Sequence, residues 1–335
     1  MIAYGMVAPG TSGGRIRMHI PDGFLSAGTL VTTAVLASGA VALALRSVRR
    51  DLPARRVPLV GLTAAFVFAA QMLNFPVAAG TSGHLIGAAL ATVLLGPAAA
   101  IIAITAVLLL QCLMFADGGV LALGANVLNL AVVAPLVAHA VYSLLRSVGG
   151  GGQRALLVAA GFAAWCSTVA AALVCAFELA ASGVVGLRPA VYAMGGVHMV
   201  IGLGEAIITM LVLSVVLRAR PGLVDGSGSD RGSRRWGRAA VALATLAIIA
   251  MVLSAPYASS LPDGLERVAE TLHFAGRAAV PAAAPLADYN LPSAVGTDPW
   301  FGAVVAGLVG ALVAFAAAWA MARVLTSDSS RSPQS

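Results

Sequence analysis

The chain has 335 residues, of which 60% are hydrophobic and 10% are charged, and its mean hydropathy is +0.95. This composition excludes an ordinary soluble protein and predicts an all-α, polytopic helical membrane protein. All 20 basic residues are arginines, so no lysine is present for a phosphate-binding Walker A loop or a pyridoxal Schiff base. The net charge of +7 does not indicate a nucleic-acid partner, because the arginines lie between apolar segments and not along one face.

Apolar stretches of membrane-spanning length, about 20 residues, follow one another along the chain. They cover residues 23–45, 57–116, 118–145, 155–177, 189–217, 239–262 and 299–322. Turn residues at 76–83, 96–97 and 117–119 divide the second stretch and separate it from the third. We therefore expect about seven helices before residue 218 and about two after it, with the helix over residues 84–95 crossing only partly.

Three arginine-rich loops set the expected orientation. Residues 46–56 contain five arginines, residues 146–154 contain two and residues 218–238 contain six. The positive-inside rule places all three loops in the cytoplasm. An even number of crossings must then separate the first two loops, and the intervening segment is long enough for four. The segment before Gly23 and the loop over residues 255–298 are therefore expected on the outer side of the cell membrane.

Local composition indicates where the chain divides. Residues 218–238 combine Pro-Gly, a Gly-Ser-Gly-Ser run and arginines, which is typical of a flexible connection between two membrane modules. The serine-rich C-terminus is typical of a disordered tail. The predicted units are an N-terminal extension of residues 1–17, a membrane domain of residues 18–217, a cytoplasmic linker of residues 218–238, a two-helix module of residues 239–325 and a tail of residues 326–335.

Met18-His19-Ile20-Pro21-Asp22-Gly23 precedes the first apolar stretch. One interpretation is a Pro-Asp-Gly turn that leads into a helix, with His19 as an interfacial side chain. The other requires that the chain begin at Met18, because the free α-amine, the His19 backbone nitrogen and Nδ1 of His19 can then form two fused chelate rings. Three such nitrogens suit a square-planar divalent ion, Ni(II) or Cu(II). Loss of the amide proton would also lower the cost of burying the ion's charge.

A further ligand is needed, and His84 is the candidate. It follows the turn Gly80-Thr81-Ser82-Gly83, which is expected on the same side of the membrane as His19. Glycines in such a turn allow close approach of the backbone and can direct a side chain inward. The alternative is that His84 begins a helix after a Thr-Ser-Gly cap and binds nothing.

Four other polar residues lie in or beside apolar stretches. His198 and Glu205 are seven positions apart and so can share one helix face, either as a functional pair or as a structural contact between helices. Gln71 and Asn74 either form hydrogen bonds that orient His84 or hold neighbouring helices together.

Residues 18–26 and 74–87 closely resemble the two signature stretches of a known family, the metal-binding membrane component of cobalt and nickel energy-coupling-factor transporters, called CbiM/NikM-like. The resemblance extends from Met18 to about residue 217. Residues 262–266, Pro-Asp-Gly-Leu-Glu, resemble the PDGLE (CbiN/NikN-like) module, an accessory component that is fused to the first in some members.

The resemblance implies a ligand set and partners. The ion would be held by the amine of Met18, the backbone nitrogen and imidazole of His19, and His84. We expect the chain to begin at Met18, because residues 1–17 would replace that amine by an amide. A second reason is that Arg15 and Arg17 would lie on the outer side, against the positive-inside rule. Processing after Arg17, or a member that lacks the amine ligand, are the alternatives. The implied partners are a transmembrane coupling subunit and two ATP-binding subunits.

The expected function is capture of Co(II) or Ni(II) outside the cell and its delivery inward by an ATP-driven complex. The ion is then the transported substrate, and no cofactor is expected. The PDGLE-like loop offers donors at Asp263 and Glu266 that could help to load the ion. A stand-alone metal channel or sensor and an intramembrane metalloenzyme are the alternatives, although no His-Glu-x-x-His pattern is present.

Overall fold

A computed structural model describes residues 18–72, 74–77, 80–219, 233–257, 259, 261–280, 282–289, 291 and 298–328. The described chain is helical, as predicted, with one two-stranded hairpin as the only sheet in these ranges. Six of its helices, including the continuous run Leu123–Val148, are long and apolar enough to cross a membrane. Residues 1–17, the predicted extension, and residues 220–232, most of the predicted linker, lie outside the described residues.

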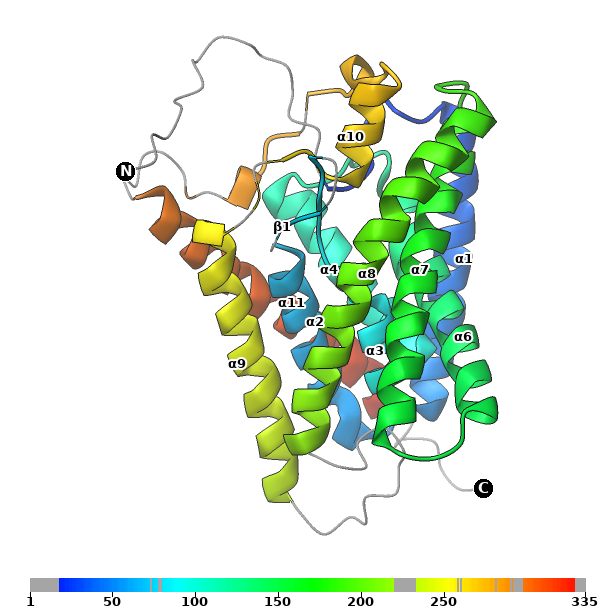
Figure 1. The fold of residues 1–335 in the computed structure, drawn as a ribbon. Helices are drawn as coiled ribbons and strands as arrows, with labels where there is room; N and C mark the ends of the chain where they lie inside the picture. Colours follow the sequence, from blue (N-terminus) through cyan, green and yellow to red (C-terminus); the bar gives the residue numbers. More distant parts are fainter. Residues whose placement is uncertain are drawn as a thin grey trace.

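The first membrane domain contains the seven helical segments that were predicted (Figure 1). They are α1 (Ala27–Asp51), α2 (Val57–Gln71), α3 (Ala88–Leu95), α4 (Pro97–Phe115), the run of α5 (Leu123–Asn126), a π-helical turn (Val127–Val133) and α6 (Ala134–Val148), then α7 (Gln153–Ala181) and α8 (Leu187–Ala219). Helix α1 begins at Ala27 and not at residue 23, because Ser26 is its N-cap and its side chain accepts the Thr29 N–H.

The chain between α2 and α3 forms a hairpin and then an extended segment. Strand β1 (Phe75–Pro76) pairs antiparallel with β2 (Ser82–Gly83). After β2 the chain is not helical until Ala88, so α3 has only eight residues. This agrees with the partial crossing expected for residues 84–95. Non-helical backbone inside a membrane domain needs buried hydrogen-bond partners.

Glu205 of α8 and Gln71 of α2 supply those partners. The Glu205 carboxylate accepts the N–H of Ile86 at 2.7 Å and the N–H of Gly87 at 2.8 Å. The Gln71 amide donates to the carbonyl of Ile86 at 3.0 Å and accepts a hydrogen bond from Gln111 at 2.7 Å. All three side chains are fully buried. They fix the course of the chain directly after His84.

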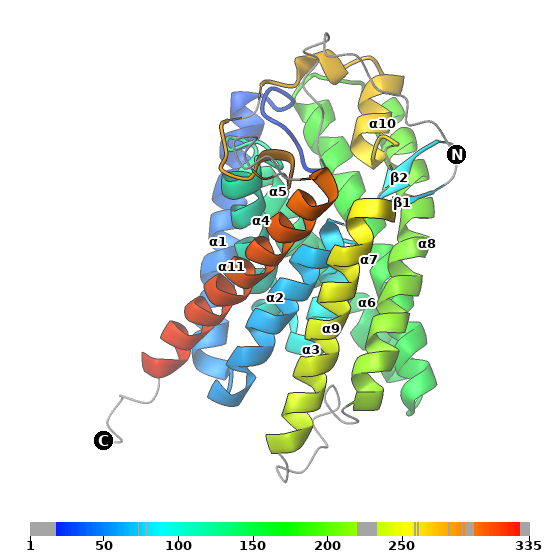
Figure 2. The same ribbon diagram turned by 90° about the vertical axis from the view of Figure 1, so that its left-hand side faces the viewer.

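The C-terminal module packs against α2. Its helices are α9 (Ser233–Tyr257), α10 (Gly264–Thr271) and α11 (Pro299–Asp328), with 3₁₀ turns at Ala275–Arg277 and Ala287–Tyr289. Helices α9 and α11 lie on either side of α2 (Figure 2). A Cβ on Gly61 would lie 2.9 Å from Phe315, so the small residue permits close packing of α2 on α11. Helix α9 begins within the predicted linker and α11 ends within the predicted tail.

The segment between α9 and α11 covers one end of the first domain, with α10 above the hairpin (Figure 2). Ser82 donates its backbone N–H to Pro262 and its hydroxyl to Leu261, both at 2.8 Å. The N–H of Ala279 donates to the carbonyl of Asp22 at 2.8 Å. The module therefore contacts both segments that the sequence singled out, the one around His19 and the turn before His84.

Candidate metal-binding site

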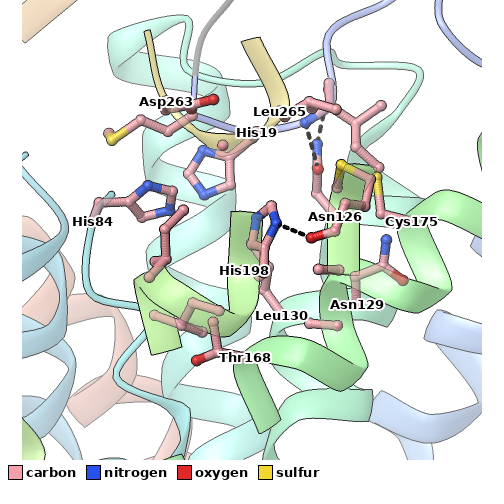
Figure 3. Close-up of a pocket in the computed structure, with 18 residues that line it drawn as sticks. His19, His84, Asn126, Asn129, Leu130, Thr168, Cys175, His198, Asp263 and Leu265 are labelled. Atoms are coloured by element: carbon pink, nitrogen blue, oxygen red, sulfur yellow. Dashed lines mark hydrogen bonds between the residues drawn. The ribbon is translucent and has the colours of Figure 1, made fainter. Parts of the chain in front are cut away.

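A cavity of about 70 Å³ lies beneath α10, at the end of the bundle that carries His19 and His84 (Figure 3). Three imidazoles and one carboxylate from four separate segments line it: His19, His84, His198 and Asp263. The remaining polar lining comes from Asn126, Asn129, Thr168 and Cys175, and Met18 also faces the space. At roughly 10–15 Å³ for each water molecule, the cavity can hold one ion with a few waters.

The segment before α1 is tied into the wall of this cavity by backbone contacts. Asn126 accepts the N–H of Ile20 at 2.9 Å and donates to its carbonyl at 3.0 Å. The Asp22 carboxylate accepts three backbone N–H groups at the start of the α5 run, from Val120, Leu121 and Ala122. These bonds fix the position of His19, which is only 2% exposed.

His19 and His84 face one another across the cavity. Their ring centroids are 6.0 Å apart and the rings are tilted by 55°. With metal–nitrogen distances of about 2 Å, two imidazoles on one ion have centroids roughly 4.5–6.5 Å apart. Burial, and secondly the nearby His19 imidazole, lower the pKa of His84 to about 3. His84 is therefore neutral at physiological pH, which is the form that binds a metal ion.

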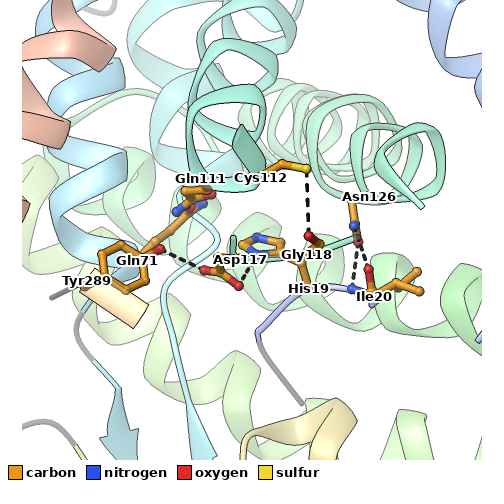
Figure 4. Close-up of polar contacts among 9 residues, drawn as sticks. All are labelled: His19, Ile20, Gln71, Gln111, Cys112, Asp117, Gly118, Asn126 and Tyr289. Carbon is orange, nitrogen blue, oxygen red and sulfur yellow. Dashed lines mark hydrogen bonds and ion pairs between the residues drawn. The ribbon is translucent and has the colours of Figure 1, made fainter. Parts of the chain in front are cut away.

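Asp117, in the turn after α4, contacts His19. Its Oδ1 lies 3.0 Å from Nδ1 of His19, and its Oδ2 accepts the hydroxyl hydrogen of Tyr289 at 2.7 Å (Figure 4). The distance is short, but the two atoms are not aligned as in a linear hydrogen bond. Burial alone would raise the pKa of Asp117, but the charge and hydrogen bonds of His19 and Tyr289 bring it below its usual value.

His198 and Asp263 complete the side-chain lining. Nδ1 of His198 lies 2.8 Å from the carbonyl of Met194, one turn earlier in α8, so its Nε2 is left for the cavity. Asp263 is the N-cap of α10 and forms a capping box with Glu266. Burial, and secondly the charge of Glu266, raise the pKa of Asp263 well above its usual value. One of its oxygens, Oδ2, is buried and without a hydrogen-bond partner among the described residues.

The candidate residues from the sequence separate into two groups. Five of them line the cavity: Met18, His19, His84, His198 and Asp263. The others lie outside it, and the side chains of Gln71, Ser82, Glu205 and Glu266 form hydrogen bonds with backbone groups. Asn74 differs, because it accepts the N–H of Ser259 through its backbone carbonyl and its buried side-chain oxygen has no hydrogen-bond partner among the described residues. His198 and Glu205 do not form a pair, because one lines the cavity while the other binds the backbone of Ile86 and Gly87.

Side chains alone do not complete a metal site in the part of the chain that the structure describes, since no group of three or more His, Cys, Asp or Glu converges there. A ligand set based on His19 and His84 therefore needs main-chain or solvent donors. Asp117, Asn126 and Tyr289 were not among the candidates. Asp117 and Asn126 could have been found as polar residues beside apolar runs, whereas no sequence signal connects Tyr289 to His19.

Comparison with known protein families identifies the family to which this chain belongs. The family described as cobalt uptake substrate-specific transmembrane region, CbiM, matches residues 19–223, and the PDGLE domain matches residues 237–327. The chain belongs to the CbiM family. The resemblance of both signature stretches and of the PDGLE motif is thereby confirmed, as is the fusion of the two domains.

Two of the similar proteins are named as fused transport proteins. A protein of Archaeoglobus fulgidus named as a fused nickel transport protein NikMN is 35% identical over 314 residues, which cover 91% of this CbiM-family chain and 98% of that protein. The fused nickel transport protein NikMN of Rhodobacter capsulatus is 39% identical over 253 residues, covering 70% and 73% of the two chains. The cobalt transport protein CbiM of Geobacter sulfurreducens is 34% identical over 256 residues and covers 71% of each.

A solved structure of a transition metal transporter has the same fold, with a TM-score of 0.56 at 33% identity, over 64% of this chain and all of that one. A truncated transition metal transporter gives a TM-score of 0.55 at 34% identity, over 60% and 99% of the two chains. The all-α, multi-pass membrane fold predicted from the sequence is confirmed.

Proposed function

We propose that this chain, a multi-pass component of a metal transporter, is the substrate-capture subunit of an energy-coupling-factor importer for Ni(II) or Co(II). The observation that carries the proposal is the meeting of His19 and His84 at one cavity, with ring centroids 6.0 Å apart. Neutral imidazoles and amine or amide nitrogens are the donors that these late divalent ions prefer. Relatives with both domains are named as nickel transport proteins.

The proposed ligands are the amine of Met18, the backbone nitrogen and imidazole of His19, and His84. Gln71 and Glu205 support His84 by holding Ile86 and Gly87, the backbone that follows it. We place this site on the outer side of the membrane, since the arginine-rich loops of the chain are expected in the cytoplasm.

The proposed energy source lies in partner subunits. The sequence contains no lysine, so it has no Walker A loop with which to hydrolyse ATP. A transmembrane coupling subunit and two ATP-binding subunits would supply that step. The glycine- and alanine-rich helix surfaces could provide the docking faces for the coupling subunit.

Metal binding by the purified chain tests the site. A preparation that begins at Met18 should bind close to one Ni(II) or Co(II) per chain, and His19→Ala and His84→Ala should each abolish that stoichiometric binding. His139→Ala is the matched control, because His139 is exposed on α6 and does not line the cavity. Equal binding by all four proteins would disprove the proposed site.

Uptake into vesicles tests the transport mechanism. Ion accumulation should require the coupling and ATP-binding subunits together with ATP, and it should fail with His84→Ala. Accumulation by the chain alone, at an undiminished rate, would instead establish a stand-alone channel.

A further inference from the structure

Asp117 contacts the His19 imidazole at its Nδ1 atom. Nδ1 lies 3.0 Å from Oδ1 of Asp117, and a carboxylate oxygen can only accept a hydrogen bond, so this contact favours a proton on Nδ1. Nε2 is the ring nitrogen that Asp117 leaves for the cavity. This atom is buried, has no hydrogen-bond partner among the described residues and belongs to a residue that lines the cavity.

The C-terminal module holds Asp117 in turn. Tyr289, in the module, donates its hydroxyl to the other carboxylate oxygen at 2.7 Å, across 172 positions of sequence. The Tyr289 ring is itself held, stacked on Phe115 at a centroid distance of 4.7 Å, with Phe68 at 6.2 Å. The carbonyl of Met114 also accepts the N–H of Leu286, three residues before Tyr289. Figure 4 shows the resulting row of Tyr289, Asp117 and His19.

This arrangement cannot coexist with the full chelate of the proposed function. A chelate through the His19 backbone nitrogen closes a ring only with Nδ1, and Nδ1 is the atom that faces Asp117. His19 must therefore turn away from Asp117 before the chelate forms. Until then, its Nε2 and the His84 imidazole are the nitrogens that an entering ion meets. A carboxylate on the far nitrogen of a ligating imidazole is a common way to fix its orientation and raise its basicity.

We propose that Asp117 and Tyr289 are positioning residues for an entry site, in which Nε2 of His19 and the imidazole of His84 receive a late divalent metal ion before the chelate closes around it. The inference rests on the proposed function and adds a binding step that needs no free amine at Met18. In this step the PDGLE domain influences ion binding indirectly. Its Tyr289 hydroxyl holds Asp117, and Asp117 in turn orients His19.

The test compares two forms of the full-length chain, one that begins at Met18 with a free amine and one that begins at Met1, in which the Met18 nitrogen is an amide. The Met1 form can use only the entry site. It should bind Co(II) or Ni(II) more weakly than the Met18 form, should lose binding with His84→Ala, and should not show the spectrum of planar Ni(II).

The decisive variant is Tyr289→Phe, which removes the hydroxyl and leaves the aromatic ring to stack on Phe115. In the Met1 form it should weaken ion binding about tenfold, the lower end of the usual effect of losing such a partner. The loss should be smaller in the Met18 form, because His19 no longer contacts Asp117 in its final complex. Tyr192→Phe, a change at an exposed ring of α8, should alter neither form.

A double-mutant cycle separates positioning from packing. If the hydroxyl acts through Asp117, adding Tyr289→Phe to Asp117→Asn should cause no further loss of affinity, whereas independent effects would add. Three outcomes would overturn the inference. The losses of the two single variants could add, the affinity of Tyr289→Phe could be unchanged in the Met1 form, or the loss could be equal in both forms. If only the Met18 form binds an ion, the proposed function stands and the entry site does not. If neither form binds, both fail.

Discussion

The carboxylate of Glu205 accepts the backbone N–H of Gly87 at 2.8 Å, and thereby connects the middle of α8 to the non-helical chain that follows His84. The same carboxylate accepts the N–H of Ile86 at 2.7 Å. The sequence left Glu205 either as one member of a functional pair with His198 or as a structural contact between helices, and in the structure its carboxylate is an acceptor for backbone N–H groups. Its effect on the cavity is indirect, because it fixes the segment that presents His84.

Replacing Glu205 by glutamine should destabilise the protein. A glutamine has one acceptor oxygen where glutamate has two, so one buried N–H would face an NH₂ group, at a cost of about 1–3 kcal/mol. We expect a lower Tm and, because His84 lies two residues before Ile86, a lower metal affinity. Ser214→Ala, at a half-buried position of the same helix where the hydroxyl donates to the carbonyl of Leu211, is the control. An unchanged Tm would mean that the two N–H groups find other acceptors.

Replacement of Asp263 by alanine should lower stability more than replacement by asparagine. Asparagine caps a helix about as well as aspartate, whereas alanine at an N-cap costs about 1 kcal/mol. Thermal unfolding should therefore show Asp263→Ala as less stable than Asp263→Asn. Equal Tm values for the two variants would exclude a capping role in holding α10.

The pH dependence of stability at Asp263 follows from its raised pKa. A carboxyl whose pKa is higher in the folded state than its ordinary value of 3.8 contributes stability that is present below that pH and is lost as pH rises through the raised pKa. Asparagine does not titrate. The free energy of unfolding of Asp263→Asn, relative to the unchanged chain, should therefore increase as pH rises from about 4. A difference that is constant with pH would contradict the raised pKa.

Blocking the amine at Met18 should remove the planar complex. In a chain that begins at Met18, the amine is one of the proposed nitrogen donors, and acetylation makes it an amide. The absorption of planar Ni(II) should disappear, and affinity should fall to that of the Met1 form. Mass spectrometry of the intact chain gives the extent of acetylation and also the residue at which the chain begins in its native membrane. Undiminished planar absorption after complete acetylation would exclude the amine as a ligand.

Metal affinity should decrease on acidification, but not through His84. Because the pKa of His84 is about 3, this imidazole carries no proton to displace near neutral pH. The protons come from the amine, with an ordinary pKa of about 8, and from the amide that becomes a ligand, so roughly two are released for each ion near pH 7.5. Isothermal titration calorimetry in buffers of different ionisation enthalpy measures this number. A release close to zero would argue against the chelate.

The helical fold was predictable because its signals are local. Apolar length, arginine-rich loops and turn residues are properties of short stretches, and they gave the seven helical segments and the two of the C-terminal module. The short helix α3 followed from the glycine and proline residues around it. The sequence could not show where α9 and α11 would pack, because alanine-rich faces are alike along the whole chain.

The candidate site likewise has features that the sequence shows and features that only the tertiary structure shows. The sequence by itself determined the His19 and His84 motifs, since each is a short stretch of distinctive residues. Only the tertiary structure decided that Glu205 binds backbone, that His198 and Asp263 line the cavity, and that Tyr289 reaches Asp117. These contacts join residues between 100 and 200 positions apart, or place a side chain on one face of a helix. They depend on how apolar helices pack, and interhelical packing is the sum of many weak contacts that no single stretch encodes.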